Sequence, residues 1–225
     1  MSAELGQDAT EQARFNMIAQ QIRPWDVMEP RVLAALQAVA RERFVPPGLR
    51  SLAFVDTEIP LPEGQCMFAP KLEARLAQEL DLLPTDHVLE IGAGSGHMAA
   101  LLSRLCDTVI SLEIRPRLVQ MAKSNLEQSG IQNVTVALGN GLSSQDGWSS
   151  RQFDAVLVSG GLSSIPESLL DLLKTEGRLV AIVGEAPIMR AVRVQRRGSS
   201  LVEEGLFETL VPLLDHSPRS DPFKF

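Results

Sequence analysis

The feature that most constrains the fold is an alternation of short apolar runs and amphipathic segments that begins at residue 87. Short runs rich in Val, Ile and Leu are typical of strands buried in a sheet. We predict such strands at 87–91, 108–114, 133–138, 153–159 and 178–184. We predict helices between them at 97–105, 115–130 and 166–177. Repeated strand–helix units indicate a parallel sheet with helices packed against it.

The end of this region has a different pattern. After Gly184 the helical periodicity stops, and residues 191–214 contain two apolar runs on either side of the sequence RRGSS. Gly and Ser between two such runs favour a hairpin. We therefore expect an α/β fold with a mostly parallel, seven-stranded sheet that ends in antiparallel strands.

The segment before residue 84 is predicted to be mainly helical. Apolar residues recur at helical spacing in 9–22, 29–44 and 69–83, and RPWD breaks the first of these helices. The connection at 45–65 is rich in Pro and Gly but too apolar for a flexible linker. We interpret 1–83 as a helical cap and lid and 84–225 as the core, the two forming one compact unit.

A glycine-rich loop, EIGAGSG, joins the first strand of the core to its first helix. Gly92, Gly94 and Gly96 allow a sharp turn and a close approach of the backbone to a ligand. The helix that follows offers free N–H groups at its positive end. The dinucleotide fingerprint GxGxxG is not matched, because His97 stands at its last position, and an NAD-dependent oxidoreductase is therefore disfavoured.

Further candidates follow the next strands, whose carboxyl ends meet at the ligand-binding edge of such a sheet. Glu113 ends the second strand, where an acid can accept hydrogen bonds from ribose hydroxyls. Asn140 and Gly141 follow the third strand, and Ser159 ends the fourth. The predicted ligand-binding residues are Glu90, Gly92, Ala93, Gly94, Gly96, Glu113, Ile114, Asn140, Gly141 and Ser159.

Composition excludes several classes of function. The net charge of −7 provides no long-range attraction for nucleic acids or anionic membranes. The two cysteines and three histidines show no spacing of a metal site. No run of about 18 apolar residues and no apolar leader is present, so we expect a cytoplasmic protein. The oligomeric state stays open.

Taken together, these segments resemble the protein-L-isoaspartate O-methyltransferase family over about residues 15–214. The glycine loop, with its GxGxG spacing, resembles that of many S-adenosylmethionine-dependent methyltransferases. More specific is the combination of LAFVDTEIPLPEGQ with the N-terminal segment NMIAQQIRPWDVMEPRVLAALQAVARERFVP. The motifs LGNG, FDAVLVSGG and FETLVPLL continue the resemblance along the chain.

The resemblance implies a class I, Rossmann-like methyltransferase fold for the core. S-adenosylmethionine would lie across the glycine loop, with Glu113 on its ribose and the turn at Asn140 near its adenine. The family methylates the free α-carboxylate beside an isoaspartyl linkage in damaged proteins. A carboxylate is already a nucleophile at neutral pH, and the sulfonium is already activated. No catalytic acid–base pair is therefore needed, and none is assigned.

The segment EGQCMFAPK departs from the family, whose usual motif there is GQTISxP. The resemblance implies that Gln65, Cys66, Met67 and Phe68 lie beside the cofactor and the substrate. Phe68 replaces a serine that could donate a hydrogen bond to a carboxylate, a loss of about 1.5–3 kcal/mol. Cys66 is interpreted as a small apolar substitute for Thr, not as a nucleophile.

Three hypotheses remain open at this point. The protein methylates isoaspartyl residues, as the resemblance implies. Alternatively, Met67 and Phe68 line an apolar pocket for a small-molecule acceptor. A third possibility is a protein that binds the cofactor without turnover.

Overall fold

The computed structural model describes residues 2–143 and 151–217. Its centre is a seven-stranded sheet in the order β5-β4-β3-β6-β7-β8-β9, which confirms the predicted fold class. Along this order, every neighbouring pair from β5 to β7 is parallel. β8 pairs antiparallel with β7, and β9 pairs antiparallel with β8. The strands are β3 (His87–Ile91), β4 (Thr108–Glu113), β5 (Val134–Leu138), β6 (Phe153–Leu162), β7 (Leu173–Glu185), β8 (Ile188–Arg197) and β9 (Ser200–Glu208).

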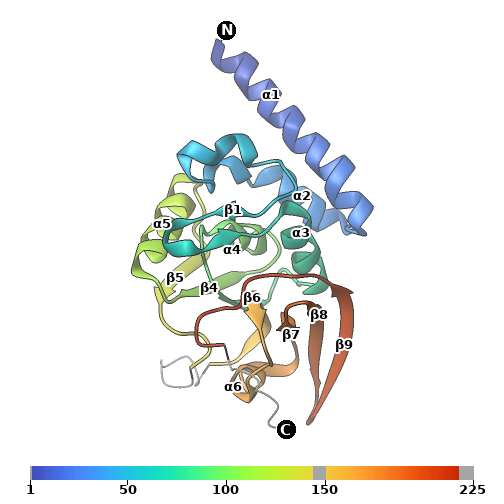
Figure 1. Ribbon diagram of the computed structural model, residues 1–225. Helices are drawn as coiled ribbons and strands as arrows, with labels where there is room; N and C mark the ends of the chain where they lie inside the picture. The colour runs from blue at the N-terminus through green and yellow to red at the C-terminus, as the bar shows by residue number, and fades with distance from the viewer. Residues whose placement is uncertain (1, 144–150, 218–225) are drawn as a thin grey trace.

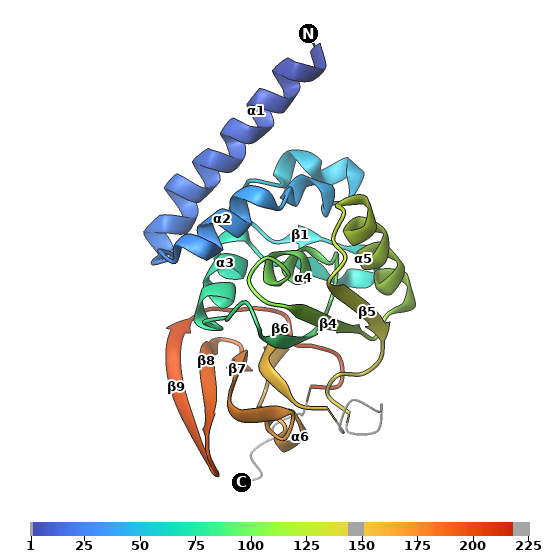
Figure 2. The ribbon, with the colours of Figure 1, turned by 180° about the vertical axis from the view of Figure 1, so that it is seen from behind.

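Helices lie on both sides of this sheet (Figures 1 and 2). Most of them, with the N-terminal cap, cover one face, while α6 lies beyond the other. They are α1 (Ser2–Met17), α2 (Pro30–Ala38), α3 (Pro70–Glu79), α4 (His97–Leu102), α5 (Pro116–Gln128) and α6 (Glu167–Leu170). A π-helical turn at Ile18–Ile22 extends α1, and a left-handed Asp26 ends the segment at the predicted RPWD break. No helix in the described ranges is both long enough and apolar enough to cross a bilayer.

The apolar side chains of the inner strands divide between the two faces of the sheet. In β6, Ala155 and Leu157 join the cluster under the cap helices, whereas Val156 and Val158 join the cluster around α6. All four side chains are fully buried. Burial on both faces explains why these strands appear in the sequence as continuous apolar runs.

The structure corrects two predicted helices. The helix expected at 166–177 ends at Leu170, because Leu173 already pairs with Phe153 of β6 and Glu176 has a left-handed φ of 63°. The helix expected at 29–44 ends at Ala38, where Val39 turns to an extended conformation. β6 is also longer than predicted, so Ser159 lies inside the strand, not at its end.

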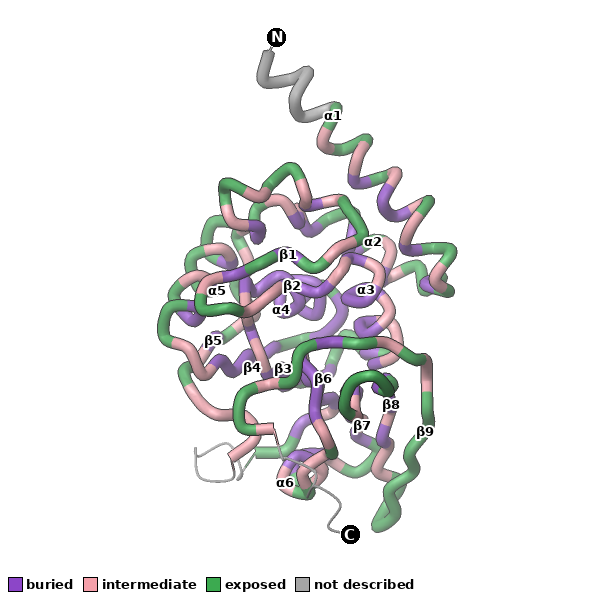
Figure 3. Tube along the Cα trace, in the orientation of Figure 1, coloured by how far each residue is buried: buried purple, intermediate pink, exposed green. Residues whose placement is uncertain are grey.

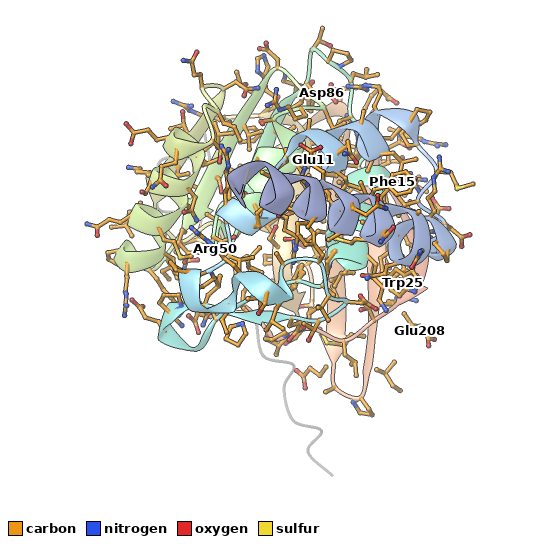
Figure 4. The ribbon with its side chains drawn as sticks, turned by 90° about the horizontal axis from the view of Figure 1, so that it is seen from above. Glu11, Phe15, Trp25, Arg50, Asp86 and Glu208 are labelled. Carbon is orange, nitrogen blue, oxygen red and sulfur yellow. The ribbon has the colours of Figure 1, made fainter. Side chains whose placement is uncertain are left out.

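The predicted cap is joined to the core by direct side-chain packing. The Phe44 ring packs edge-on against His97, with ring centroids 5.4 Å apart. Trp25 packs edge-on against Phe207 of β9, a strand that is largely exposed (Figure 3). Figure 4 labels Trp25 and Glu208, the last residue of this strand. The larger buried cluster contains residues of both 1–83 and 84–225. We therefore expect the two ranges to unfold together.

Phe44→Ala tests this expectation. Phe44 is fully buried, so its truncation should lower the free energy of global unfolding by about 3–5 kcal/mol. Phe44→Leu keeps most of the volume and should lose less than about 1.5 kcal/mol. Urea unfolding followed by circular dichroism should show one transition for each variant. Two transitions, with the later one unshifted, would mean that the cap unfolds separately.

Candidate active site

The glycine loop turns sharply between β3 and α4. Gly92 and Gly96 have φ values of 99° and 86°, which favour glycine. A Cβ on Gly92 would lie 3.0 Å from the Ser159 carbonyl oxygen, and one on Gly96 would lie 3.2 Å from Ala122 Cα. β6 and α5 thus lie so close to the loop that a side chain at either glycine would be crowded.

A cavity of about 570 Å³ lies beside this loop, at the carboxyl ends of β3, β4, β5 and β6. Nine of the residues predicted from the sequence line it: Gln65, Cys66, Gly92, Gly94, Glu113, Ile114, Asn140, Gly141 and Ser159. The topology therefore brings together residues at or near the ends of β3, β4, β5 and β6 and residues of the segment before α3.

A second cavity, of about 300 Å³, lies beside residues 66–68 and the glycine loop. It contains the predicted residues Ala93, Met67 and Phe68, together with Glu73, Ser95 and Met98. Cys66, Gly92, Gly94 and Ser159 line both cavities. The two spaces therefore meet at the glycine loop and form a larger and a smaller lobe of one site.

Glu113 both shapes the loop and lines the larger cavity. Its Oε2 accepts a hydrogen bond from the Gly94 N–H at 3.0 Å, and its Oε1 accepts one from the Arg115 N–H at 3.0 Å. Each carboxylate oxygen has a second lone pair. Glu113 can therefore hold the loop and still accept a hydrogen bond from a ligand.

Two predicted residues, Glu90 and Gly96, are not among those that line either cavity. Glu90 is fully buried behind the loop, where its carboxyl group accepts hydrogen bonds from Ser111 at 2.6 Å and Ser159 at 2.9 Å. Burial raises the pKa of Glu90 to about 8, with Glu73 and Glu113 adding to the shift and the two serines opposing it. Glu90 is therefore largely protonated at neutral pH and supports the wall of the site.

The lid segment consists of two very short strands and the turn between them. β1 (Ile59–Pro60) pairs antiparallel with β2 (Cys66–Met67), and the Leu61 N–H donates to the Gln65 carbonyl at 2.7 Å. The half-buried Cys66 has its pKa raised to about 11, by burial first and then by Glu58. Its thiol stays protonated at neutral pH, which agrees with the apolar interpretation.

Phe68 is buried and is not among the residues that line the larger cavity. Its residue is 7% exposed, and its ring lines the smaller cavity. Its carbonyl oxygen accepts a hydrogen bond from Arg41 Nη2 at 2.7 Å. The bulk of the ring therefore fills space behind the lid segment.

Arg41 is part of a buried charge cluster, formed with Glu73 and His97. Arg41 Nη1 and His97 Nδ1 both contact Glu73 Oε2, the latter at 2.9 Å. Burial would raise the pKa of Glu73, but the charges and hydrogen bonds of Arg41 and His97 lower it overall. Burial lowers the pKa of His97 more than Glu73 raises it. Glu73 is therefore ionised and His97 neutral.

The sequence prediction missed this cluster and the rim of the larger cavity. Glu73 lies 32 residues from Arg41 and 24 from His97, so no local spacing relates them. At the rim, Arg115 forms ion pairs with Glu63 and with Asp215, which follows the last strand. Arg115 directly follows the predicted Ile114 and could have been found, but Asp215 is 100 residues away.

Comparison with protein families gives a match over residues 12–217 to "Protein-L-isoaspartate(D-aspartate) O-methyltransferase (PCMT)". The chain belongs to this family. A Protochlamydia amoebophila protein-L-isoaspartate O-methyltransferase is 40% identical over 182 residues, which are 79% of this chain and 85% of that protein. A Picosynechococcus protein of the same name is 36% identical, over 93% of this chain and 94% of that protein.

Solved structures show the same fold. A Plasmodium falciparum protein assigned to the same methyltransferase class, crystallised with S-adenosyl-L-homocysteine, superposes with a TM-score of 0.79 at 20% identity. The match covers 91% of this chain and 97% of that one. A further protein-L-isoaspartate O-methyltransferase superposes with a TM-score of 0.75, over 91% of this chain and 65% of that one, at 24% identity. The class I methyltransferase architecture of this family member is therefore confirmed.

The raised pKa of Glu90 predicts a pH-dependent stability. Between about pH 5 and about pH 8, Glu90 is protonated in the folded protein and ionised in the unfolded chain. The folded state binds more protons in this window, so its stability falls as the pH rises. Glu90→Gln mimics the protonated acid and removes this contribution. Urea unfolding across the window should show the wild type losing stability relative to the variant, whereas parallel curves would contradict the assignment.

The raised pKa of Cys66 predicts slow alkylation. At about pH 8, a thiol with a pKa of about 11 should react with iodoacetamide roughly 100-fold more slowly than an unperturbed cysteine. Peptide mass spectrometry measures the modification of Cys66 separately from that of Cys106. A fast reaction of Cys66 at this pH would show a thiolate and restore the nucleophile hypothesis.

Proposed function

We propose that this protein transfers the methyl group of S-adenosylmethionine to the α-carboxylate beside an isoaspartyl linkage. One observation carries the proposal: the cavity beside the glycine loop is lined by Glu113, Asn140 and Gln65, which come from three segments that the family shares. The names of the curated relatives support the same activity.

The two lobes of the site fit S-adenosylmethionine, which has an adenosine part and a shorter amino-acid arm. The larger lobe has the carboxylate of Glu113 for the ribose hydroxyls and the turn at Asn140 and Gly141 for the adenine. The smaller lobe suits the arm and meets the larger one at Gly92 and Gly94. When bound, the cofactor supplies an activated methyl group on a sulfonium centre.

The residues of this chain would act mainly by orientation. A carboxylate needs no general base at neutral pH, so no proton has to be removed from the acceptor. The glycine loop and Glu113 would hold the cofactor, while Gln65 and Cys66 would lie between cofactor and substrate at the lid. Correct placement and the exclusion of water then supply the rate enhancement.

The replacement of the family's serine by Phe68 weakens one contact without blocking the larger lobe. The Phe68 ring lines the smaller cavity and is almost fully buried. A phenyl ring cannot donate the hydrogen bond that a serine at this position would donate to the acceptor carboxylate. We therefore expect activity on isoaspartyl peptides that is lower than a serine at this position would allow.

A small apolar acceptor is the second candidate. The observation in its favour is that Met67, Phe68 and Met98 line the smaller lobe. Such an acceptor would need no serine hydroxyl at position 68. Methylation of small molecules in a metabolite extract, without methylation of isoaspartyl peptides, would favour it.

The direct test is transfer of a labelled methyl group to a peptide that contains one isoaspartyl residue, with the aspartyl peptide as control. We expect transfer to the isoaspartyl peptide alone. Phe68→Ser should raise kcat/KM by up to roughly 10- to 150-fold through the restored hydrogen bond. Phe68→Ala removes the ring without adding a hydroxyl and should not give this gain. No transfer by a protein that binds the cofactor would contradict the proposal.

A further inference from the structure

The smaller lobe contains an ionised side chain that has no role in the methyl transfer proposed above. Glu73, on the first turn of α3, is 4% exposed and lines this lobe with Phe68, Met98 and the glycine loop. The thiol of Cys66 is protonated there, because its pKa is raised to about 11. Among the described residues that line the smaller lobe, Glu73 is thus the one with an ionised side chain.

Only one of the two carboxylate oxygens of Glu73 contacts other side chains of the described protein. Arg41 Nη1 and His97 Nδ1 both contact Oε2. No described residue donates a hydrogen bond to Oε1. Arg41 also donates to the carbonyl oxygens of Ala53 at 2.9 Å and Phe68 at 2.7 Å, which fixes it in place. One oxygen of a buried, ionised and immobilised carboxylate is therefore available to a ligand in this lobe.

We propose that Glu73 binds the α-ammonium group of the amino-acid arm of S-adenosylmethionine. This inference rests on the cofactor of the proposed function and adds a binding residue to its site. An ammonium group is the complement of a carboxylate, and a hydrogen bond between two charged groups is among the strongest available.

Calorimetry with two ligands tests this contact without any enzymatic turnover. One ligand is S-adenosylhomocysteine, and the other is its analogue with hydrogen in place of the α-amino group. The wild type should bind the analogue about 10- to 150-fold more weakly. Glu73→Gln should bind both ligands with affinities that differ by less than about threefold, because a neutral amide no longer distinguishes them. Glu79→Gln, on the same helix but paired with Arg75, should behave like the wild type.

The outcomes separate this inference from the proposed function. Equal binding of both ligands by the wild type would overturn it, even if the protein methylates isoaspartyl peptides. Undiminished discrimination by Glu73→Gln would overturn it as well. Loss of Arg41's partner could prevent Glu73→Gln from folding, and Glu73→Asp then replaces it. The Asp variant keeps the charge on a shorter side chain and should discriminate less than the wild type; equal discrimination would contradict the contact.

Discussion

The position of the lid relative to the glycine loop depends on the buried guanidinium of Arg41. A buried charged group is tolerated only when its hydrogen-bond donors have partners. The partners of Arg41 lie in four different segments of the chain. Arg41 Nε donates to Ala53, Nη2 donates to Phe68, and Nη1 contacts Glu73 and the start of α4 at His97. The early end of α2 at Ala38 precedes this inward-pointing arginine. Arg41 therefore links the cap to the site, because it holds the backbone at Phe68, next to the lid segment.

Two buried acidic residues near the glycine loop, Glu90 and Glu73, differ in protonation because their surroundings differ. Glu90 has serine hydroxyls as partners and no cation, so burial raises its pKa to about 8. Glu73 is equally buried, yet Arg41 and His97 lower its pKa. Glu113 accepts two backbone hydrogen bonds at the edge of the larger lobe. Glu73, which lines the smaller lobe, is thus ionised, whereas Glu90, which lines neither cavity, is largely protonated.

The sequence was sufficient for features that depend on local pattern. The strands were predicted from apolar runs, and the loop at Gly92 from glycine spacing, because backbone geometry restricts which residues fit there. The helix expected at 166–177 was wrong because Leu173 pairs with β6, and pairing between distant segments overrides helical periodicity. Glu73 and Asp215 were missed for the same kind of reason: their partners, Arg41 and Arg115, are far away in the sequence.

The central claim is that the two lobes hold the two parts of one cofactor. A crystal structure of the complex with S-adenosylhomocysteine tests it most directly. The account predicts the ribose hydroxyls on Glu113, the adenine beside Asn140, and the amino-acid arm in the smaller lobe with its ammonium group on Glu73. An arm directed away from Glu73 into solvent, or a ligand bound outside the larger lobe, would contradict the account.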